Sequence, residues 1–310
     1  MKHMDYQYSI IIPHFNIPSL LRRCLWSIPN REDTQIIVVD DKSSEDNLIK
    51  LKNLESDFPY VTFIYSEKNG GGGKARNIGL KYALGKYILF ADADDFFNYC
   101  IFDVLEKYKY ETCDMVVFNA TYVDTDTYLR TKRTPALNNY MRQYEKDKND
   151  FVFRYVFGEP WCKLIKRDLI NSHHVQFEEV PIHNDTKFSY TIGYYSRIVK
   201  VDNIALYTLA DRPNSVSKST SVDKLLMRVG VFAQKNKFLA DNGIEYFDEM
   251  MLYSFDSFIF RGDFVNLSKC YDVAFKYGLS RRYINEKLFY YELKRVFRKV
   301  QRLLFKHDTI

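Results

Sequence analysis

Two groups of aspartates follow short apolar runs that are typical of buried strands. Asp40-Asp41 comes after Gln35–Val39, and Asp92-Ala93-Asp94-Asp95 comes after Tyr87–Phe90. Ionised carboxylates held this close repel one another unless a cation lies between them. Oxygen ligands of this kind suit Mg²⁺ or Mn²⁺, which usually complete their shell with water and substrate phosphates. The pattern predicts a metal site for a diphosphate-bearing substrate; the alternative is that these acids cap helices or are solvated at strand ends.

A run of four glycines, Gly70–Gly73, precedes the cations Lys74 and Arg76. Glycine lets the backbone approach a ligand closely, and a helix N-terminus offers free N–H groups. The segment is therefore a candidate anion site. It matches neither the Walker pattern nor a dinucleotide fingerprint, so a flexible connector is an equal interpretation.

Alternating strands and helices are predicted for the first third of the chain. Apolar residues recur at helical spacing from Leu20 to Ile28, and a second helix is predicted over Lys74–Leu84. This alternation predicts an open, mostly parallel sheet with ligands beyond the carboxyl ends of its strands, where the aspartates lie. The predicted strands are Tyr8–Pro13, Gln35–Val39, Val61–Tyr65, Tyr87–Phe90 and Met115–Phe118.

The composition of the 310-residue chain is that of a globular protein, with 46% hydrophobic and 27% charged residues. A net charge of +5 is compatible with anionic substrates or membrane surfaces and far from that of a nucleic-acid-coating protein. The five cysteines include no Cys-x-x-Cys pair, which favours reduced thiols. With no signal core or membrane-spanning run, we expect a cytoplasmic protein.

Four ordered motifs resemble the family 2 glycosyltransferases of the GT-A fold. They are SIIIPHFN at Ser9–Asn16, VVDDKSS at Val38–Ser44, GKARNIGL at Gly73–Leu80 and GKYILFADADD at Gly85–Asp95. The similarity continues with WCKLIKRDLI at Trp161–Ile170, HNDTKF at His183–Phe188 and RPNSVS at Arg212–Ser217. The resemblance implies an α/β, Rossmann-like, mostly parallel open sheet flanked by helices, with a helical C-terminal extension.

The same resemblance implies a division of the chain into domains. We expect a GT-A catalytic domain at 1–220, with a nucleotide-sugar-binding half at 1–120 and an acceptor-binding half at 121–220. From Lys224 onward the pattern is helical, which predicts a helical region at 221–310.

Roles in donor binding follow from the resemblance, one position at a time. Asp40 or Asp41 would contact the base or ribose of a nucleotide-sugar, with the backbone near Pro13 and the ring of Phe15 beside the base. Arg76 would approach the nucleotide or its phosphates. The residues assigned to the donor are Pro13, Phe15, Asp40, Asp41, Lys74, Arg76 and Asp92.

The segment Asp92-Ala93-Asp94 matches the Asp-x-Asp metal motif of the family. Asp94 is the first choice as a ligand for Mn²⁺ or Mg²⁺, Asp92 is assigned to the ribose or to the surroundings of the metal, and Asp95 competes with Asp94.

Asp185 lies where the family keeps a Glu-Asp pair whose aspartate is the general base. Inverting transfer needs one carboxylate to take the proton of the acceptor hydroxyl as it attacks the anomeric carbon. The chain departs from the pattern at Asn184, where a glutamate is usual. Because of this departure, Glu178 or Glu179 could serve as the base instead. The alternative for Asp185 is an acid in a surface loop without a catalytic role.

Trp161 is expected either to line the acceptor site or to belong to the core. Contacts with phosphate from Arg212, Ser215 or Ser217 are a further hypothesis.

The C-terminal stretch predicts a basic amphipathic helix. Its cations are Lys294, Arg295, Arg298, Lys299, Arg302 and Lys306, and its apolar face is formed by Val296, Phe297, Val300, Leu303 and Leu304. The helix is expected to pack on protein or to lie on an anionic membrane surface. We favour peripheral contact with the inner face of the cell membrane, because bacterial relatives often extend glycans on lipid carriers.

The resemblance thus implies an inverting, metal-dependent glycosyltransferase. Its donor would be a nucleotide-diphosphate sugar, by family habit a UDP-sugar, and its acceptor a hydroxyl of a glycan or lipid-linked molecule in bacterial surface polysaccharide biosynthesis. The alternatives are a nucleotidyltransferase and a non-catalytic nucleotide-sugar-binding or scaffold protein. The sugar, nucleotide, linkage and oligomeric state stay open.

Overall fold

A computed structural model describes residues 6–131, 136–211 and 221–304, with side chains placed as far as residue 297. The chain forms two compact units, Met1–Ser215 and Val216–Ile310. Each unit buries its own cluster of apolar side chains.

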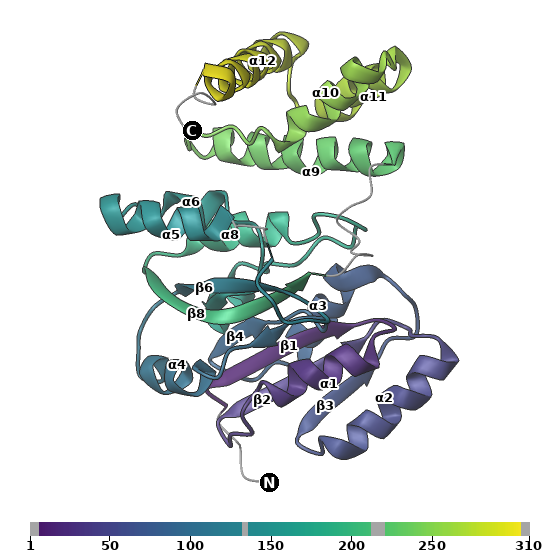
Figure 1. Ribbon diagram of the computed structural model, residues 1–310, viewed down its shortest axis with the longest axis vertical. Coiled ribbons are helices and arrows are strands. Elements are labelled where there is room, and N and C mark those ends of the chain that lie inside the picture. The colour runs from purple at the N-terminus through teal and green to yellow at the C-terminus, as the bar shows by residue number, and fades with distance from the viewer. Residues whose placement is uncertain (1–5, 132–135, 212–220, 305–310) are drawn as a thin grey trace. The chain divides into compact units, whose positions relative to one another are not determined.

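The first unit is built on one sheet of eight strands within the described residues, in the order β3-β2-β1-β4-β7-β6-β8-β5 (Figure 1). The pairs β1–β2, β1–β4, β2–β3 and β6–β8 are parallel, whereas β7 and the short β5 pair antiparallel to their neighbours. The strands are β1 (Tyr8–His14), β2 (Thr34–Asp40), β3 (Val61–Tyr65), β4 (Tyr87–Phe90), β5 (Phe96–Phe97), β6 (Met115–Asp124), β7 (Lys163–Lys166) and β8 (Val199–Asp211).

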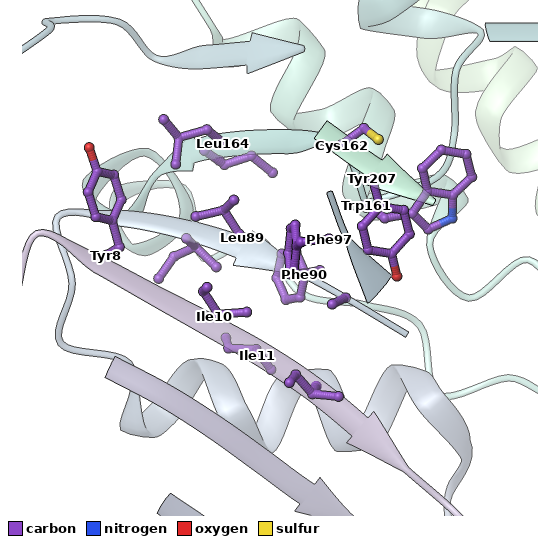
Figure 2. Close-up of a cluster of buried hydrophobic side chains, with 14 of the residues drawn as sticks. Tyr8, Ile10, Ile11, Leu89, Phe90, Phe97, Trp161, Cys162, Leu164 and Tyr207 are labelled. Atoms are coloured by element: carbon purple, nitrogen blue, oxygen red, sulfur yellow. The ribbon is translucent and has the colours of Figure 1, made fainter. Parts of the chain in front are cut away.

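Burial on both faces explains the continuous apolar runs of the central strands. All four residues of β4 are buried, and six of the seven residues of β2 are buried. Figure 2 shows side chains from β1, β4 and β7 meeting in this core, with Trp161 and Tyr207 beside each other at one end.

Helices connect the strands and cover the sheet. They are α1 (Pro18–Trp26), α2 (Glu45–Asp57), α3 (Gly71–Tyr82), α4 (Ile101–Tyr108), α5 (Ala136–Asp147), α6 (Phe151–Tyr155), α7 (Arg167–Ser172) and α8 (Thr186–Tyr195). Pro18 occupies the first position of α1, where its missing N–H costs nothing. Helix α3 packs on β1 and β2, and α6 packs on α8.

The predicted α/β class and mostly parallel sheet are confirmed. The predicted strand Val61–Tyr65 has the observed bounds, while the strand predicted at Met115–Phe118 continues to Asp124. The antiparallel strands β5 and β7 and the helix α2 were not foreseen.

The second unit is helical in its described part, as the sequence predicted. It contains α9 (Val222–Asp241), α10 (Met250–Arg261), α11 (Phe264–Phe275) and α12 (Arg281–Leu304). Gly262 ends α10 in the left-handed conformation, and the Asp263 side chain accepts from the Asn266 N–H to begin α11. Among the described residues, no helix combines the length and apolar character that crossing a bilayer requires.

The five cysteines are free, and burial is complete or nearly so for four of them: Cys24, Cys113, Cys162 and Cys270. Cys100 is half-buried.

Candidate active site

The strands β1, β2 and β4 run parallel, so their carboxyl ends meet at one edge of the sheet. Asp40 ends β2 opposite His14 of β1 in the strand register. Asp92–Asp95 follows β4. The topology therefore brings the two predicted aspartate groups to the same edge.

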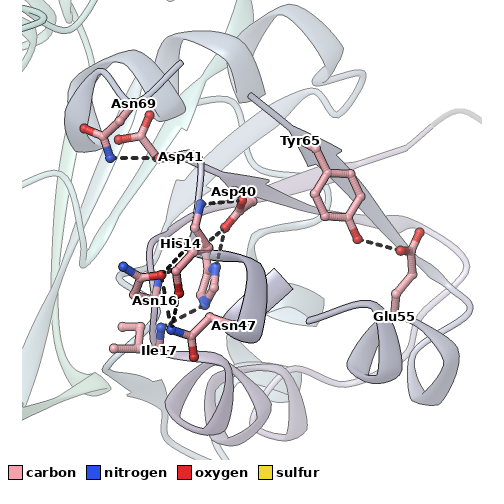
Figure 3. A network of polar contacts seen from close by, with 11 residues as sticks. His14, Asn16, Ile17, Asp40, Asp41, Asn47, Glu55, Tyr65 and Asn69 are labelled. Atoms are coloured by element: carbon pink, nitrogen blue, oxygen red, sulfur yellow. Dashed lines mark hydrogen bonds and ion pairs between the residues drawn. The ribbon is translucent and has the colours of Figure 1, made fainter. Parts of the chain in front are cut away.

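Asp40 is buried in a network that fastens β1 to the loop after β2 (Figure 3). Its Oδ1 lies 2.9 Å from His14 Nδ1, and its Oδ2 accepts from the Ser43 N–H at 3.0 Å. Because His14 Nε2 accepts from the Ile17 N–H at 3.2 Å, the imidazole proton belongs on Nδ1. Burial raises the pKa of Asp40, but the hydrogen bonds from His14 and Ser43 outweigh it and hold the pKa below its ordinary value.

Asp41 caps the N-terminus of α3 with its carboxylate. Oδ1 accepts from the Gly70 N–H at 2.9 Å and Oδ2 from the Gly71 N–H at 2.6 Å. Burial raises the pKa of Asp41, and these two N–H groups oppose the rise. The first amides of the glycine run are thus occupied by a protein carboxylate, which is the capping interpretation of this aspartate. Lys74, whose Nζ donates to the Lys68 carbonyl at 3.0 Å, flanks the same turn.

Asp92 is joined to Arg76 across the edge of the sheet. Arg76 Nη2 donates to Asp92 Oδ1 at 2.6 Å, and Nη1 donates to Asn184 Oδ1 at 3.1 Å. Arg76 is buried, with its guanidinium 5.4 Å from the ring centroid of Phe177. One guanidinium therefore links the strand-end aspartates to the residue that precedes Asp185.

Asp94 is half-buried, and its backbone is held from α1. Arg23 Nη2 donates to the Asp94 carbonyl oxygen at 2.5 Å, and Arg23 Nη1 donates to the Thr125 carbonyl at 3.1 Å. The guanidinium of Arg23 also lies 5.1 Å from the ring centroid of Phe96. Arg23 thus ties the turn that carries Asp94 to the segment after β6.

Asp95 points into the protein. Its residue is 5% exposed, and its Oδ1 accepts from the Ala210 N–H at 2.9 Å. Tyr207 donates to the same carboxyl group and accepts from the Asp92 N–H at 2.8 Å. Burial, followed by the charges of Asp92 and Asp94, raises the pKa of Asp95 well above its ordinary value.

Within the described part of the chain, no group of three or more His, Cys, Asp or Glu side chains is arranged to hold a metal ion by itself. The charges nevertheless accumulate, since Asp92 and Asp94 both raise the pKa of Asp95. An oxygen donor set of one or two carboxylates is what Mg²⁺ accepts when phosphates and water supply the remaining ligands.

Asp185 lies directly before α8, at its N-terminal end. Burial raises its pKa to about 6; Arg76 opposes the rise, whereas Glu159 and Asp92 add to it. A carboxyl group with this pKa is ionised at neutral pH yet basic enough to take a proton. The position suits a general base.

The two acids predicted as substitutes differ in their surroundings. Glu178 has a buried Oε2 with no hydrogen-bond partner, and burial raises its pKa. Glu179 is exposed, and its Oε1 lies 3.5 Å from Asn77 Nδ2.

The remaining predicted residues occupy three different environments. Pro13 lies within β1, paired with Val39, and Phe15 follows the strand with 48% of its surface exposed. Trp161 is 6% exposed and stacks on Tyr207, with ring centroids 5.8 Å apart. Its contact with an acceptor stays a prediction. Arg212, Ser215 and Ser217 lie outside the described residues.

Sequence reasoning missed three residues that support this edge of the sheet. They are His14, which bonds Asp40; Arg23, which holds the Asp94 carbonyl; and Tyr207, which joins Asp92 to Asp95. His14 lies inside the first motif, next to the proline at the end of the predicted strand, and that placement was an available signal. No sequence signal pointed to Tyr207 or Arg23, because their contacts depend on how distant segments of the chain pack together.

Comparison with known families gives one match that spans more than half of the chain. Residues 9–173 match the family model described as Glycosyl transferase family 2.

Among curated proteins, the chain is 26% identical over 250 residues to the cholesterol galactosyltransferase of Borreliella burgdorferi, an alignment that covers 73% of this chain and 69% of that protein. For the next four curated relatives, the chain spans less than two thirds of their length, from 11% to 62%.

Two kinds of solved structure share the fold. The crystal structure of S. aureus TarS 1–349 in complex with UDP-GlcNAc has a TM-score of 0.60 at 19% identity, and the match covers 82% of this chain and 80% of that one. The mannosyltransferase PcManGT from Pyrobaculum calidifontis, in complex with GDP-Man and Mn²⁺, has a TM-score of 0.56 at 15% identity, covering 94% of this chain and 81% of its own.

Proposed function

The chain belongs to glycosyl transferase family 2, and from this premise we propose that it is an inverting, metal-dependent enzyme that moves a sugar from a nucleotide-diphosphate donor to an acceptor hydroxyl. One observation carries the proposal. Arg76 bonds both Asp92, at the strand ends, and Asn184, the neighbour of Asp185, so donor-side carboxylates and a candidate base belong to one site.

In this proposal Asp185 takes the proton of the acceptor hydroxyl. Its pKa of about 6 leaves it ionised at neutral pH, and the charge of Arg76 favours that form. Attack by the oxygen on the anomeric carbon then breaks the bond to the diphosphate, which inverts the configuration. Glu178, although buried, stays a second candidate for the base.

The metal proposed is Mn²⁺ or Mg²⁺, held by Asp94 together with phosphate oxygens and water. When bound, such an ion stabilises the negative charge of the departing diphosphate. Asp95 is a weaker candidate ligand, because its carboxyl group already accepts from Ala210 and Tyr207 inside the protein. Asp92 is left for the ribose, beside its ion pair with Arg76.

The donor half of the catalytic domain is proposed at 1–120 and the acceptor half at 121–220.

A UDP-sugar is the proposed donor, supported by the UDP-GlcNAc complex of TarS. The GDP-Man complex of PcManGT supports a GDP-sugar as the alternative. A lipid-linked or glycan acceptor in surface polysaccharide biosynthesis is proposed; the name of the Borreliella relative, a cholesterol galactosyltransferase, supports the lipid part of this proposal. Phe15 is exposed beside the end of β1 and free to pack against a base.

Two conservative substitutions separate catalysis from donor binding. We expect Asp185→Asn to lower transfer by at least about a hundredfold, the usual contribution of a general base, while donor binding changes little. Asp94→Asn should weaken metal and donor binding together. Transfer is measured by release of nucleoside diphosphate, and binding by thermal shift with nucleotide-sugars in the presence and absence of Mn²⁺.

The same assays decide against the alternatives. Wild-type activity in either variant would refute the assigned roles. Release of pyrophosphate instead of nucleoside diphosphate would identify a nucleotidyltransferase, and donor binding without turnover on any acceptor would identify a sensor or scaffold.

We also propose that the protein contacts the anionic inner face of the cell membrane peripherally. The segment 216–310 contains 17 Lys and Arg against 11 Asp and Glu, so it carries more than the whole net charge of the chain. On α12, Phe289, Val296 and Phe297 are more than half exposed. Lys294 and Arg295 pair with acids of α10 and its N-cap. The side chains of the other predicted cations, Arg298, Lys299, Arg302 and Lys306, lie outside the described part of the chain. The membrane contact is therefore argued from the net charge of the segment and from the exposed apolar side chains.

Sedimentation with vesicles tests the membrane contact. We expect binding to phosphatidylglycerol-containing vesicles, weaker binding to pure phosphatidylcholine, and a loss of binding as salt rises, since each cation near the surface contributes about 1 kcal/mol. The double variant Phe289→Ser, Phe297→Ser should bind several-fold less. Tyr99→Ser, which removes an exposed aromatic of the first unit, is the matched control. Equal sedimentation with both lipids would refute the contact.

A further inference from the structure

Arg76 is a buried cation with an incomplete set of partners. Its two terminal nitrogens bond Asp92 and Asn184, whereas its Nε has no hydrogen-bond partner and only 7% of the residue is exposed. In the described part of the chain, its ion pair is with Asp92. Because little water reaches the guanidinium, its charge acts on neighbouring groups with little screening.

Asn184 uses both ends of its side-chain amide. Oδ1 accepts from Arg76 at 3.1 Å, and Nδ2 donates to the Val180 carbonyl at 3.4 Å. The Asn184 carbonyl also accepts from the Glu178 N–H at 3.0 Å. A neutral amide orients the guanidinium without cancelling its charge. A carboxylate here would place a second anion on Arg76 and remove the donor to Val180.

The glycine run makes this contact sterically possible. A Cβ added at Gly73 would lie 2.1 Å from the Glu178 carbonyl oxygen and 3.1 Å from the Asn184 Cβ, and one at Gly72 would lie 3.2 Å from Arg76 Nη1. The first turn of α3 therefore packs directly against the segment that ends at Asn184. Close packing against the Glu178 backbone is thus a sufficient reason for glycine at position 73.

Three charged side chains act on Asp185, each from a different part of the first unit. Arg76 of α3 favours the ionised form, whereas Glu159, before β7, and Asp92, after β4, favour the protonated form. The ionisation of Asp185 is therefore set by a balance between one cation and two anions.

We propose that Asn184 is a positioning residue: it holds Arg76, which is paired with Asp92, near Asp185, and because its amide is neutral it adds no second anion to Arg76, so that the base stays ionised at neutral pH. This inference rests on the proposed role of Asp185. It gives a physical reason for an amide at the position where a second acid is usual.

The pH dependence of kcat/KM tests the proposal, measured at saturating metal. A base must be ionised, so wild-type activity falls as the pH drops through about 6, the pKa of Asp185. Asn184→Asp adds an anion beside Arg76, which should raise the pKa of the base and move the acidic limb up by about one unit. Glu159→Gln removes an exposed anion and should move the limb down. Asn184→Gln keeps the amide and should leave the limb in place.

Carboxyl ¹³C NMR titration of Asp185 without donor or acceptor gives a second readout that does not depend on turnover. The same ordering of the four proteins is expected, with circular dichroism to confirm that each is folded. Wild-type activity in Asp185→Asn would show that Asp185 is not the base, and would refute the proposed function. The inference alone would be overturned by a different outcome. In that outcome Asp185→Asn is inactive, but the acidic limb and the Asp185 titration stay in place in both Asn184→Asp and Glu159→Gln.

Discussion

A single phenolic hydroxyl group ties together the aspartates at the end of β4. Tyr207 is fully buried, accepts from the Asp92 N–H at 2.8 Å, donates to the Asp95 carboxyl group and stacks on Trp161. Burial is the first cause of its raised pKa, followed by the charges of Asp95 and Asp92, so the hydroxyl stays protonated and able to donate. Trp161 thus packs against the residue that joins Asp92 to Asp95.

Tyr207→Phe should lower the free energy of unfolding by about 1–3 kcal/mol, because it removes one hydrogen bond from the buried Asp95 carboxyl group and leaves the Asp92 N–H without a partner. It should also weaken donor binding by roughly tenfold, as the Asp92–Asp95 turn loosens. Urea denaturation and nucleotide thermal shift measure the two effects. Tyr8→Phe removes another buried hydroxyl, which donates to the Leu105 carbonyl at 2.6 Å, and should affect stability only. A donor affinity that falls equally in both variants would contradict a local role for Tyr207.

The N-terminal turn of α3 depends on the absence of a side chain at Gly73. Gly73→Ala would drive a Cβ into the Glu178 backbone, which cannot yield as a flexible side chain can. We expect a loss of about 1–3 kcal/mol in stability, the usual cost of overpacking. Transfer activity should fall with it, because α3 carries Arg76 away from Asn184.

Thermal denaturation and transfer assays of two variants check this expectation. Gly158→Ala is the matched control, since an added Cβ there meets nothing within 4 Å. A Gly73→Ala protein as stable and active as the control would show that α3 tolerates displacement from the segment 178–184.

Periodicity and motif order were enough to predict the parallel core strands and the order in which the aspartates reach the sheet edge. They were not enough to orient the carboxyl groups. Asp95 turns inward because β8 supplies the Ala210 N–H and Tyr207, residues more than a hundred positions later. Asp41 turns to the α3 amides for a similar reason, since its partners come from the next connection of the sheet. Such orientations depend on tertiary packing, which local pattern does not encode.

The antiparallel strands were also missed because they depend on tertiary packing. Lys163 is the first residue of β7, yet it is 1% exposed and its Nζ donates to the Phe157 carbonyl at 2.6 Å. A lysine in a strand usually indicates an exposed position, and here a backbone carbonyl and the face of Phe157 satisfy the charge instead.

The described residues form two separate hydrophobic cores, one in each compact unit. The larger includes residues from Tyr8 to Tyr207, and the smaller includes residues from Leu225 to Ile284. The second unit also encloses its own ion pair, Lys235 Nζ to Asp248 Oδ2 at 2.5 Å, between side chains that are 2% and 7% exposed. Each unit thus has a buried apolar core of its own, as independent cooperative unfolding requires.

Matched core truncations in the full chain test that separation. Phe255→Ala and Phe118→Ala each remove a ring from a fully buried site, one in the second unit and one in the first, and each should cost about 3–5 kcal/mol. Amide hydrogen exchange should accelerate across α9–α11 in the Phe255 variant while β1, β2 and β4 keep wild-type protection, and the pattern should reverse in the Phe118 variant. Because the proposed catalytic residues all lie in the first unit, donor binding should persist in the Phe255 variant. Faster exchange throughout the chain in both variants would instead establish a single cooperative fold and contradict the division.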